Sequence, residues 1–243
     1  MTETEITKLL HIKASDRVLD VGGSMKQLTE INVDTLVDII HPDDSNYNKH
    51  RLTAKHFLKL DIESQDLPFA DKSFDICICT HTLEDLHWPF RIIGEISRVA
   101  KRGVIITPGR GMDCSFNSVN LTDWQTGSRR IPGTSHHHWL FENIHGRLII
   151  TPKNYPLLYS SGMNIVSWTG ESECVYLWKD KINFFSDNEL NLNFKKLITN
   201  YRKFNLANNR HIKLFPVVIF LDNPFFYLKE FTKLLLMKFN IIH

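Results

Sequence analysis

The chain has 243 residues, enough for one large α/β domain or for one medium domain with a smaller appendage. Hydrophobic residues make up 42% and charged residues 23% of the sequence, which is the balance of an ordinary globular protein and excludes long disorder. The 29 basic and 27 acidic residues leave a net charge of +2. This charge is too close to neutral to favour nucleic acid or a membrane surface as a partner.

Targeting signals and cysteine pairs are not evident in the sequence. Residues 1–12 mix Glu, Thr and Lys without an apolar core, so we expect no secretory signal and a cytoplasmic protein. The apolar run Val217–Leu221 is too short to cross a bilayer, so we expect no membrane insertion. The cysteines lack the spacing of a zinc site or a disulfide framework, which predicts four reduced thiols and no metal site. They are Cys77, Cys79, Cys114 and Cys174.

Five apolar runs alternate with polar turns and helical segments in the first half of the chain. The predicted strands are Arg17–Val21, Thr35–Ile40, Phe57–Ile62, Phe74–Cys79 and Val104–Thr107. A helix is predicted over Met25–Ile31, and a second over Phe90–Ala100 with Gly103 as its cap. This alternation predicts a doubly wound, Rossmann-like, mostly parallel sheet, in which ligands bind beyond the carboxyl ends of the strands.

The second half of the chain has weaker periodicity. Residues 109–150 predict an irregular inserted loop that would close over the substrate. Asn164–Trp168 and Ser172–Trp178 predict an antiparallel terminal hairpin around Thr169-Gly170-Glu171. Further helices are predicted at Glu189–Leu206 and Phe225–Phe239. We therefore expect one domain over 1–180 with the inserted loop 109–150, and an α-rich extension over 181–243.

The predicted helix Phe225–Phe239 carries an apolar stripe interrupted by lysines. Such a stripe can lie on a membrane surface. More often it packs on its own domain or on a second subunit, which we favour. A homodimer through this helix is the corresponding candidate assembly.

Polar residues follow the first two predicted strands where each strand ends. Gly22 would let the backbone approach a ligand closely, and a helix N-terminus after it would offer free N–H groups. Asp38, eighteen residues after Asp20, can accept two hydrogen bonds from a ribose diol. Each feature alone is also typical of a dinucleotide-binding domain, of a ligand-free turn or of an exposed loop aspartate.

Three further motifs follow in order: Asp61-Ile62, the stretch DLPFADKSFD from Asp66 to Asp75, and THTLEDL from Thr80 to Leu86. With VLDVGGS at the first strand, Asp38 and the Glu95–Val99 helix, they resemble class I S-adenosylmethionine-dependent methyltransferases of the type 11 kind. The resemblance covers about residues 15–108. It implies a methyltransferase with S-adenosylmethionine as its cofactor. A nicotinamide-dependent reductase has no role for the Leu-Pro-Phe and Ser-Phe-Asp motifs.

The resemblance also implies roles for individual residues at the strand ends. Asp20 and Gly22 would hold the methionine end of the cofactor, Asp38 the ribose hydroxyls, and Asp61 the adenine amino group. The full set implied around the cofactor is Asp20, Gly22, Gly23, Ser24, Asp38, Asp61, Ile62, Thr80 and His81.

The sequence departs from the family pattern at three positions. Ser24 and Lys26 stand where the family turn has its second and third glycines, and Asp85 stands where histidine is usual. Serine is small enough for the turn. The first two departures also suit a non-catalytic, methyltransferase-like binding protein or partner subunit, which is the alternative function.

Catalysis by this fold needs mainly the alignment of acceptor and methyl, with a base only if the acceptor must lose a proton. His81, His137 and His138 are the candidate bases, because histidine titrates near neutral pH. The run His136–His138 is more often explained as a solvated or structural loop, and a metal site there lacks an identifiable fourth ligand. The predicted function is methyl transfer to a small-molecule acceptor, with a sugar or glycan-intermediate hydroxyl as the candidate. Thr80-His81-Thr82 stands where nucleic-acid methyltransferases carry their Pro-Pro signature, so no nucleic-acid partner is expected.

Overall fold

The computed structural model describes residues 1–44, 51–114, 133–134, 136–154, 166–167, 171–186, 199, 213–214, 224–239 and 241. The chain divides into two compact units. The first comprises Met1–Pro108, Phe141–Ile150 and Glu173–Ser186, and the second comprises the remaining segments. The four cysteines are free and buried, as predicted.

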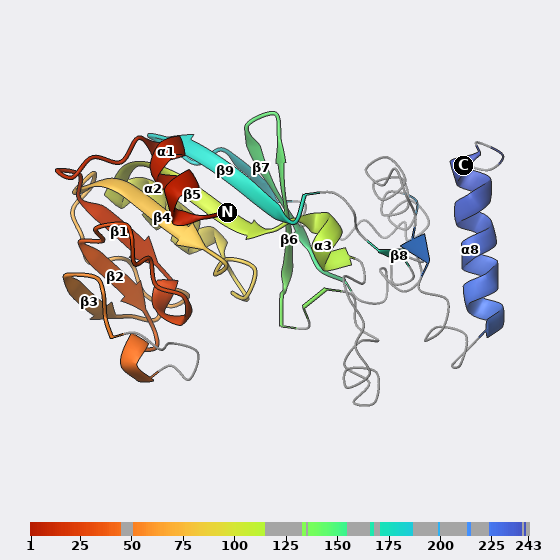
Figure 1. The fold of residues 1–243 in the computed structure, drawn as a ribbon, viewed down its shortest axis with the longest axis horizontal. Helices are drawn as coiled ribbons and strands as arrows, with labels where there is room; N and C mark the ends of the chain where they lie inside the picture. Colours follow the sequence, from red (N-terminus) through yellow and green to blue (C-terminus); the bar gives the residue numbers. More distant parts are fainter. Residues whose placement is uncertain are drawn as a thin grey trace. The chain divides into compact units, whose positions relative to one another are not determined.

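A six-stranded sheet in the order β3-β2-β1-β4-β5-β9 forms the first unit (Figure 1). Strands β1 to β5 are parallel to their neighbours, and β9 is antiparallel to β5. Their bounds are β1 (Val18–Val21), β2 (Thr35–Asp38), β3 (His56–Lys59), β4 (Phe74–Thr80), β5 (Ala100–Pro108) and β9 (Glu173–Lys179). The chain runs outward from β1 to β3 and returns to β4 beside β1, which confirms the doubly wound, mostly parallel sheet. The order reverses between β1 and β4, where such sheets bind ligands.

Two helices carry apolar faces that pack in the first unit. In α1 (Glu3–Leu10), Ile6 and Leu10 join a buried cluster with Val18, Ile76 and Val104 of the sheet. Helix α2 (Phe90–Val99) confirms the predicted second helix, and its apolar positions Ile92, Ile93, Ile96 and Val99 are buried. Full burial of one such side chain contributes about 1.5–3 kcal/mol. The period of 3.6 residues in α2 therefore fixes which side of the helix faces inward.

The turn before β4 is held by two charged residues of α2. Arg98 donates to the carbonyl oxygens of Phe69 (2.7 Å) and Leu67 (2.8 Å). Glu95 accepts from the Leu67 amide (2.9 Å) and forms an ion pair with Arg98 (2.7 Å). Phe69 packs edge-to-face on Phe74, which is fully buried. We name Leu67–Phe69 with Glu95 and Arg98 the clamped turn.

The prediction of a helix over Met25–Ile31 is wrong. Only a single 3₁₀ turn, η1 (Gly23–Met25), follows β1. The Glu3 carboxylate in α1 instead accepts from the amides of Thr29, Glu30 and Ile31 (3.0, 2.7 and 3.2 Å). These tertiary hydrogen bonds satisfy the amide donors that a helix would have used internally.

Gly103 lies inside β5 and does not cap the preceding helix, which ends at Val99. A Cβ atom at Gly103 would lie 2.0 Å from the Cys77 carbonyl oxygen and 2.9 Å from the Trp178 ring. The glycine is therefore needed for close packing between strands and not for a left-handed cap.

The prediction of a terminal hairpin is wrong, because its two strands do not pair with each other. Strand β9 pairs with β5, whereas β8 (Val166–Ser167) pairs with β11 (Lys213–Leu214). Strand β9 is antiparallel to its neighbour, as predicted, but that neighbour is β5. The nine-residue strand β5 offers β9 more backbone partners than the two-residue strand β8 would. The described part of 109–150 is also more regular than predicted.

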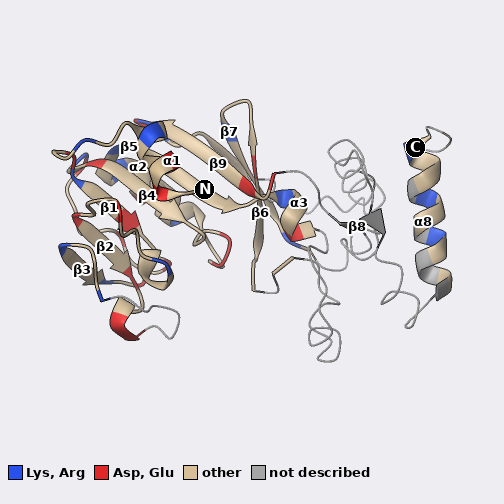
Figure 2. Ribbon diagram, viewed as in Figure 1, with Lys and Arg blue, Asp and Glu red and all other residues tan. Residues whose placement is uncertain are grey.

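This part of 109–150 contains α3 (Arg110–Cys114), β6 (Trp139–Ile144) and β7 (Arg147–Pro152). Strands β6 and β7 lie in a three-stranded sheet with β10 (Phe184–Ser186). His145 and Gly146 connect β6 to β7 with φ angles of 51° and 74°, the left-handed pair that a tight hairpin turn requires. Figure 2 shows acidic and basic residues interspersed over the elements of the first unit.

Helix α8 (Pro224–Lys238) confirms the predicted C-terminal helix. Phe225 and Leu228 on it are 83% and 53% exposed. Among the described residues, no helix is long and apolar enough to span a membrane. The helix predicted over 189–206 apart from residue 199, the apolar run Val217–Leu221 and most of residues 115–135 lie outside the described residues.

Candidate functional site

The glycine turn after β1 passes close to two side chains. Gly22 has φ +79°, its amide donates to the Val37 carbonyl (2.8 Å), and a Cβ there would lie 2.2 Å from Thr82 Oγ1. A Cβ at Gly23 would lie 2.0 Å from Asp20 Oδ2. Any side chain at either position would therefore displace Thr82 or Asp20. The close approach of the Thr82 and Asp20 side chains to the backbone therefore requires glycine at both positions.

Asp20 lies in β1 with only 2% of its surface exposed. Its Oδ1 atom has no hydrogen-bond partner among the described residues. Burial, and secondly the charge of Asp38, raises the pKa of Asp20 to about 8. A neighbouring cation would favour the ionised carboxylate, and an ammonium could donate a hydrogen bond to the free Oδ1, so this residue fits an ammonium group.

Asp38 ends β2, and backbone amides orient its carboxylate. The Ser24 amide donates to Oδ2 (2.9 Å) and the Ile40 amide to Oδ1 (3.2 Å). Ser24 itself is fully buried, so the serine in place of glycine is accommodated in the turn. The predicted residues Asp20, Gly22, Gly23, Ser24 and Asp38 are thus brought together at the carboxyl ends of β1 and β2.

Asp61 follows β3 and stabilises its own turn. Its carboxylate accepts from the Glu63 amide (3.0 Å) and from Ser64 Oγ (2.6 Å). The hydrogen bond from Ser64, and then that from Glu63, lowers the pKa of Asp61. Ile62 beside it is buried. The carboxylate is therefore ionised and fixed in direction, and its implied adenine contact stays a prediction.

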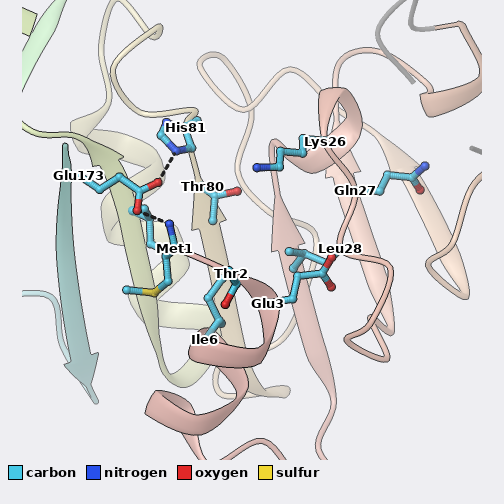
Figure 3. Close-up of a pocket in the computed structure, with 11 residues that line it drawn as sticks. Met1, Thr2, Glu3, Ile6, Lys26, Gln27, Leu28, Thr80, His81 and Glu173 are labelled. Carbon is cyan, nitrogen blue, oxygen red and sulfur yellow. Dashed lines mark hydrogen bonds and ion pairs between the residues drawn. The ribbon is translucent and has the colours of Figure 1, made fainter. Parts of the chain in front are cut away.

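A cavity of about 260 Å³ lies at the carboxyl ends of β4 and β5 (Figure 3). Thr80 and His81 line it, together with residues of α1, of the segment after η1 and of β9. Typical pockets for whole ligands have about 300–1,000 Å³, so this cavity suits part of a larger ligand. Its lining residues are Met1, Thr2, Glu3, Ile6, Lys26, Gln27, Leu28, Thr80, His81, Ile106 and Glu173.

His81 stands between two carboxylates at the edge of the cavity. Its Nδ1 lies 3.4 Å from Glu84 Oε1, and its Nε2 lies 3.3 Å from Glu173 Oε1. The Met1 amine also donates to Glu173. The hydrogen bond to Glu84, against the effect of burial, raises the pKa of His81. Both ring nitrogens then favour donating protons to these two carboxylates, so His81 is poorly suited to accept a proton from a substrate.

The second unit contains a buried cluster around His137. Both oxygens of Asp113 in α3 lie 2.9 Å from His137 Nδ1. Lys153 Nζ donates to the Thr134 carbonyl (2.8 Å) and lies 3.4 Å from Asp113 Oδ1. Burial, against the attraction of Asp113, lowers the pKa of Lys153. The carboxylate of Asp113 therefore fixes the orientation of the His137 ring.

His138 is exposed, and its carbonyl accepts the Lys153 amide (2.8 Å). His136 is also exposed, and its ring packs edge-to-face on His137 with centroids 5.0 Å apart. Of the run His136–His138, only His137 is thus a buried residue with a carboxylate partner on its ring.

A comparison with known families matches part of the first unit. Residues 17–107 match the family described as "Methyltransferase domain". This match supports a class I methyltransferase domain over these residues. The cofactor of this class is S-adenosylmethionine. No curated protein matches the chain.

Several solved structures are similar to the methyltransferase domain. A putative methyltransferase from Bacillus halodurans is 16% identical, with 56% of this chain and 60% of that chain covered and a TM-score of 0.38. A SAM-dependent methyltransferase from Methanosarcina mazei is 25% identical, with 42% and 57% covered and a TM-score of 0.33. A Haloferax volcanii complex of the Trm112 activator with a putative methyltransferase is 19% identical, with 44% and 51% covered and a TM-score of 0.35. The match spans 51% to 60% of the length of these three chains.

The residues of the methyltransferase domain fit the cofactor of this class. The buried Oδ1 of Asp20, which has no partner among the described residues, offers an acceptor for a ligand at the switch point. Asp38 offers an oriented carboxylate one strand away.

Sequence reasoning missed Thr82, Glu173, Asp113 and Lys153. Thr82 contacts Gly22 across 60 positions, and Asp113 contacts His137 across 24. No local spacing relates such pairs, and only the family motif THTLEDL marked the region of Thr82.

Proposed function

We propose that this chain transfers a methyl group from S-adenosylmethionine to a small-molecule acceptor. The single observation that carries the proposal is the match of residues 17–107 to methyltransferase domains, whose strand ends here hold Asp20, the glycine cradle and Asp38. The bound cofactor would supply an electrophilic methyl group, and the task of the protein is to align an acceptor with it.

Each residue at the strand ends would bind a different part of the cofactor, according to its chemistry. Asp20 would accept hydrogen bonds from the ammonium group of the cofactor, and Asp38 would accept them from the ribose hydroxyls. Asp61 and Ile62 would bind the adenine, and Thr80 would form the floor at the end of β4. Gly22, Gly23 and Ser24 would present backbone to the ligand.

A hydroxyl of a sugar or glycan intermediate is the proposed acceptor. Such a group must lose a proton during transfer, so it needs a base. Asp113 holds the ring of His137 in a fixed orientation through Nδ1, as a base requires. We assign this role to His137 ahead of His138 and His81, because His81 is held between two carboxylates.

Calorimetry with S-adenosylhomocysteine and with NADH tests the cofactor. Binding of the first and not of the second is expected. Incubating metabolite extracts with methyl-labelled S-adenosylmethionine then tests the activity. Labelling of a sugar-containing product supports the full proposal, whereas labelling of a protein or nucleic acid contradicts the proposed acceptor.

His137→Ala tests the base once an acceptor is labelled. Turnover should fall about 10²–10⁴-fold while affinity for S-adenosylhomocysteine is unchanged. His136→Ala is the matched control, because its ring lies beside His137 and the exposed residue has no proposed role. Full turnover of His137→Ala on a hydroxyl acceptor would remove His137 from the mechanism.

A non-catalytic binding protein or partner subunit is the second candidate function. The missing helix after β1 favours it, because the turn has no continuous helix N-terminus to support a ligand. One matched structure is a methyltransferase in complex with an activator, which makes a partner protein a reasonable alternative. Cofactor binding without any labelled product, alone or with cell extract, would favour this candidate.

The proposal has three further parts. It includes a domain over 1–180 with an extension over 181–243, a homodimer through α8 and a cytoplasmic location. Size-exclusion chromatography with light scattering of the whole chain and of a Phe225→Ser, Leu228→Ser variant tests the homodimer. Both side chains are more than half exposed, so the substitutions should leave the fold intact.

A further inference from the structure

The charged side chains that line the cavity beside the glycine turn differ in their partners. Glu3 accepts three backbone amides of the segment 29–31. Glu173 pairs with His81, and His81 also pairs with Glu84. Each of these groups has its charge and hydrogen-bonding capacity engaged inside the protein.

Lys26 is the exception among the described residues. It lines the same cavity, yet no hydrogen bond or ion pair of its ammonium is found in the part of the chain that the structure describes. Figure 3 shows the side chain extended from the segment after η1 across the cavity toward Thr80. The cavity therefore presents a positive charge with free donors opposite the hydroxyl-bearing end of β4.

We propose that Lys26 binds a carboxylate of the ligand that enters this cavity. Lys26 is exposed at the rim of the cavity, and its ammonium with three donors is complementary to a carboxylate. The inference rests on the proposed function for the source of the carboxylate. It comes either from the amino-acid end of the cofactor or from an acidic acceptor such as a sugar acid.

Calorimetry with two probes distinguishes these sources. S-adenosylhomocysteine carries the amino-acid carboxylate, whereas 5′-methylthioadenosine has the same nucleoside without it. Lys26→Met should weaken binding of the first about tenfold and leave binding of the second unchanged if the cofactor supplies the carboxylate. Lys26→Arg should restore most of the affinity, because it restores the charge.

Lys8→Met is the matched control, because it removes the same charge from an exposed position of α1 outside the cavity lining. It should change neither affinity. Circular dichroism of all variants checks that the fold is retained.

A second arm uses glucuronate and glucose as probes, with and without saturating S-adenosylhomocysteine, followed by NMR line broadening of the sugar. If the acceptor supplies the carboxylate, Lys26→Met weakens only glucuronate binding. Equal affinities of wild type and Lys26→Met for all four probes would overturn the inference. Failure of the wild type to bind either nucleoside would refute the proposed cofactor instead, and the glucuronate arm would then decide the role of Lys26 alone.

Discussion

The glycine turn after β1 and the clamped turn before β4 both match family motifs, but their polar groups are satisfied differently. In the clamped turn, Arg98 and Glu95 engage the backbone of Leu67 and Phe69 with hydrogen bonds of 2.7–2.9 Å. In the glycine turn, Asp20 Oδ1 is buried without a partner among the described residues. The first turn is complete within the protein, whereas the second keeps an acceptor for the proposed ligand.

This difference separates structural motifs from binding motifs in the same domain. A buried polar atom without a partner costs about 1–3 kcal/mol, and a protein retains such an atom where function uses it. Substitutions in the clamped turn should therefore lower stability and leave ligand affinity unchanged. Substitution of the unpartnered carboxylate at the glycine turn should weaken ligand binding and raise stability near neutral pH.

Asp20→Asn should produce the largest change, through the pH dependence of stability. The pKa of Asp20 is about 8 in the folded state and 3.8 in the unfolded chain. Between these values the unfolded chain has released the proton and the folded chain keeps it. Stability of the wild type should therefore fall as pH rises from 4 to 8, by at most about 1.4 kcal/mol per pH unit.

Urea denaturation at several pH values measures this slope. Asp20→Asn removes the titrating group, so the variant should be more stable at pH 7.5, should lose this part of the slope, and should bind S-adenosylhomocysteine more weakly. An Asn variant less stable than the wild type at pH 7.5 would mean that Asp20 is a satisfied structural carboxylate.

Arg98→Met should lower the free energy of unfolding by about 2–3 kcal/mol, because it leaves the Leu67 and Phe69 carbonyls and Glu95 without their donor. Affinity for S-adenosylhomocysteine should not change. Arg91→Met on the same helix is the control: its ion pair with Asp66 is largely exposed and should contribute less than about 1 kcal/mol. An equal loss of unfolding free energy in the two variants would show that Arg98 does not stabilise the clamped turn.

Asp38→Ala should weaken S-adenosylhomocysteine binding by about 1.5–3 kcal/mol, the range for hydrogen bonds to a charged group. The exposed Asp44→Ala provides the control for loss of one negative charge near β2. Calorimetry measures both affinities. Unchanged affinity in Asp38→Ala would show that the ribose is bound elsewhere.

His81→Gln should have the smallest effect. The pKa of His81 is raised by the hydrogen bond to Glu84, so its contribution to stability is present at pH 6 and is lost as pH rises through the folded pKa. The side chain is 45% exposed, so the loss at pH 6 should be about 0.5 kcal/mol and should vanish by pH 9. His56→Gln on β3 is the exposed control. A loss that persists at pH 9 would point to packing and not to charge.

The doubly wound sheet could be predicted from the sequence because local pattern specifies it. Runs such as Phe74–Cys79 must be buried on both faces, and the spacing of Ile92, Ile93, Ile96 and Val99 fixes the buried face of α2. Asp20, Gly22 and Asp38 could be placed at strand ends for the same reason. Each of these features depends on residues close together in the chain.

Tertiary contacts decided what local pattern could not. The segment after η1 has the composition of a helix, but Glu3 of α1 takes its amide hydrogen bonds. Asp113 and His137 are 24 residues apart, and no periodicity marks them as partners. The sequence by itself determined which segments are buried and where the binding edge lies. Only the folded chain determined which polar groups meet, because a hydrogen bond depends on the distance between two atoms and not on their separation along the chain.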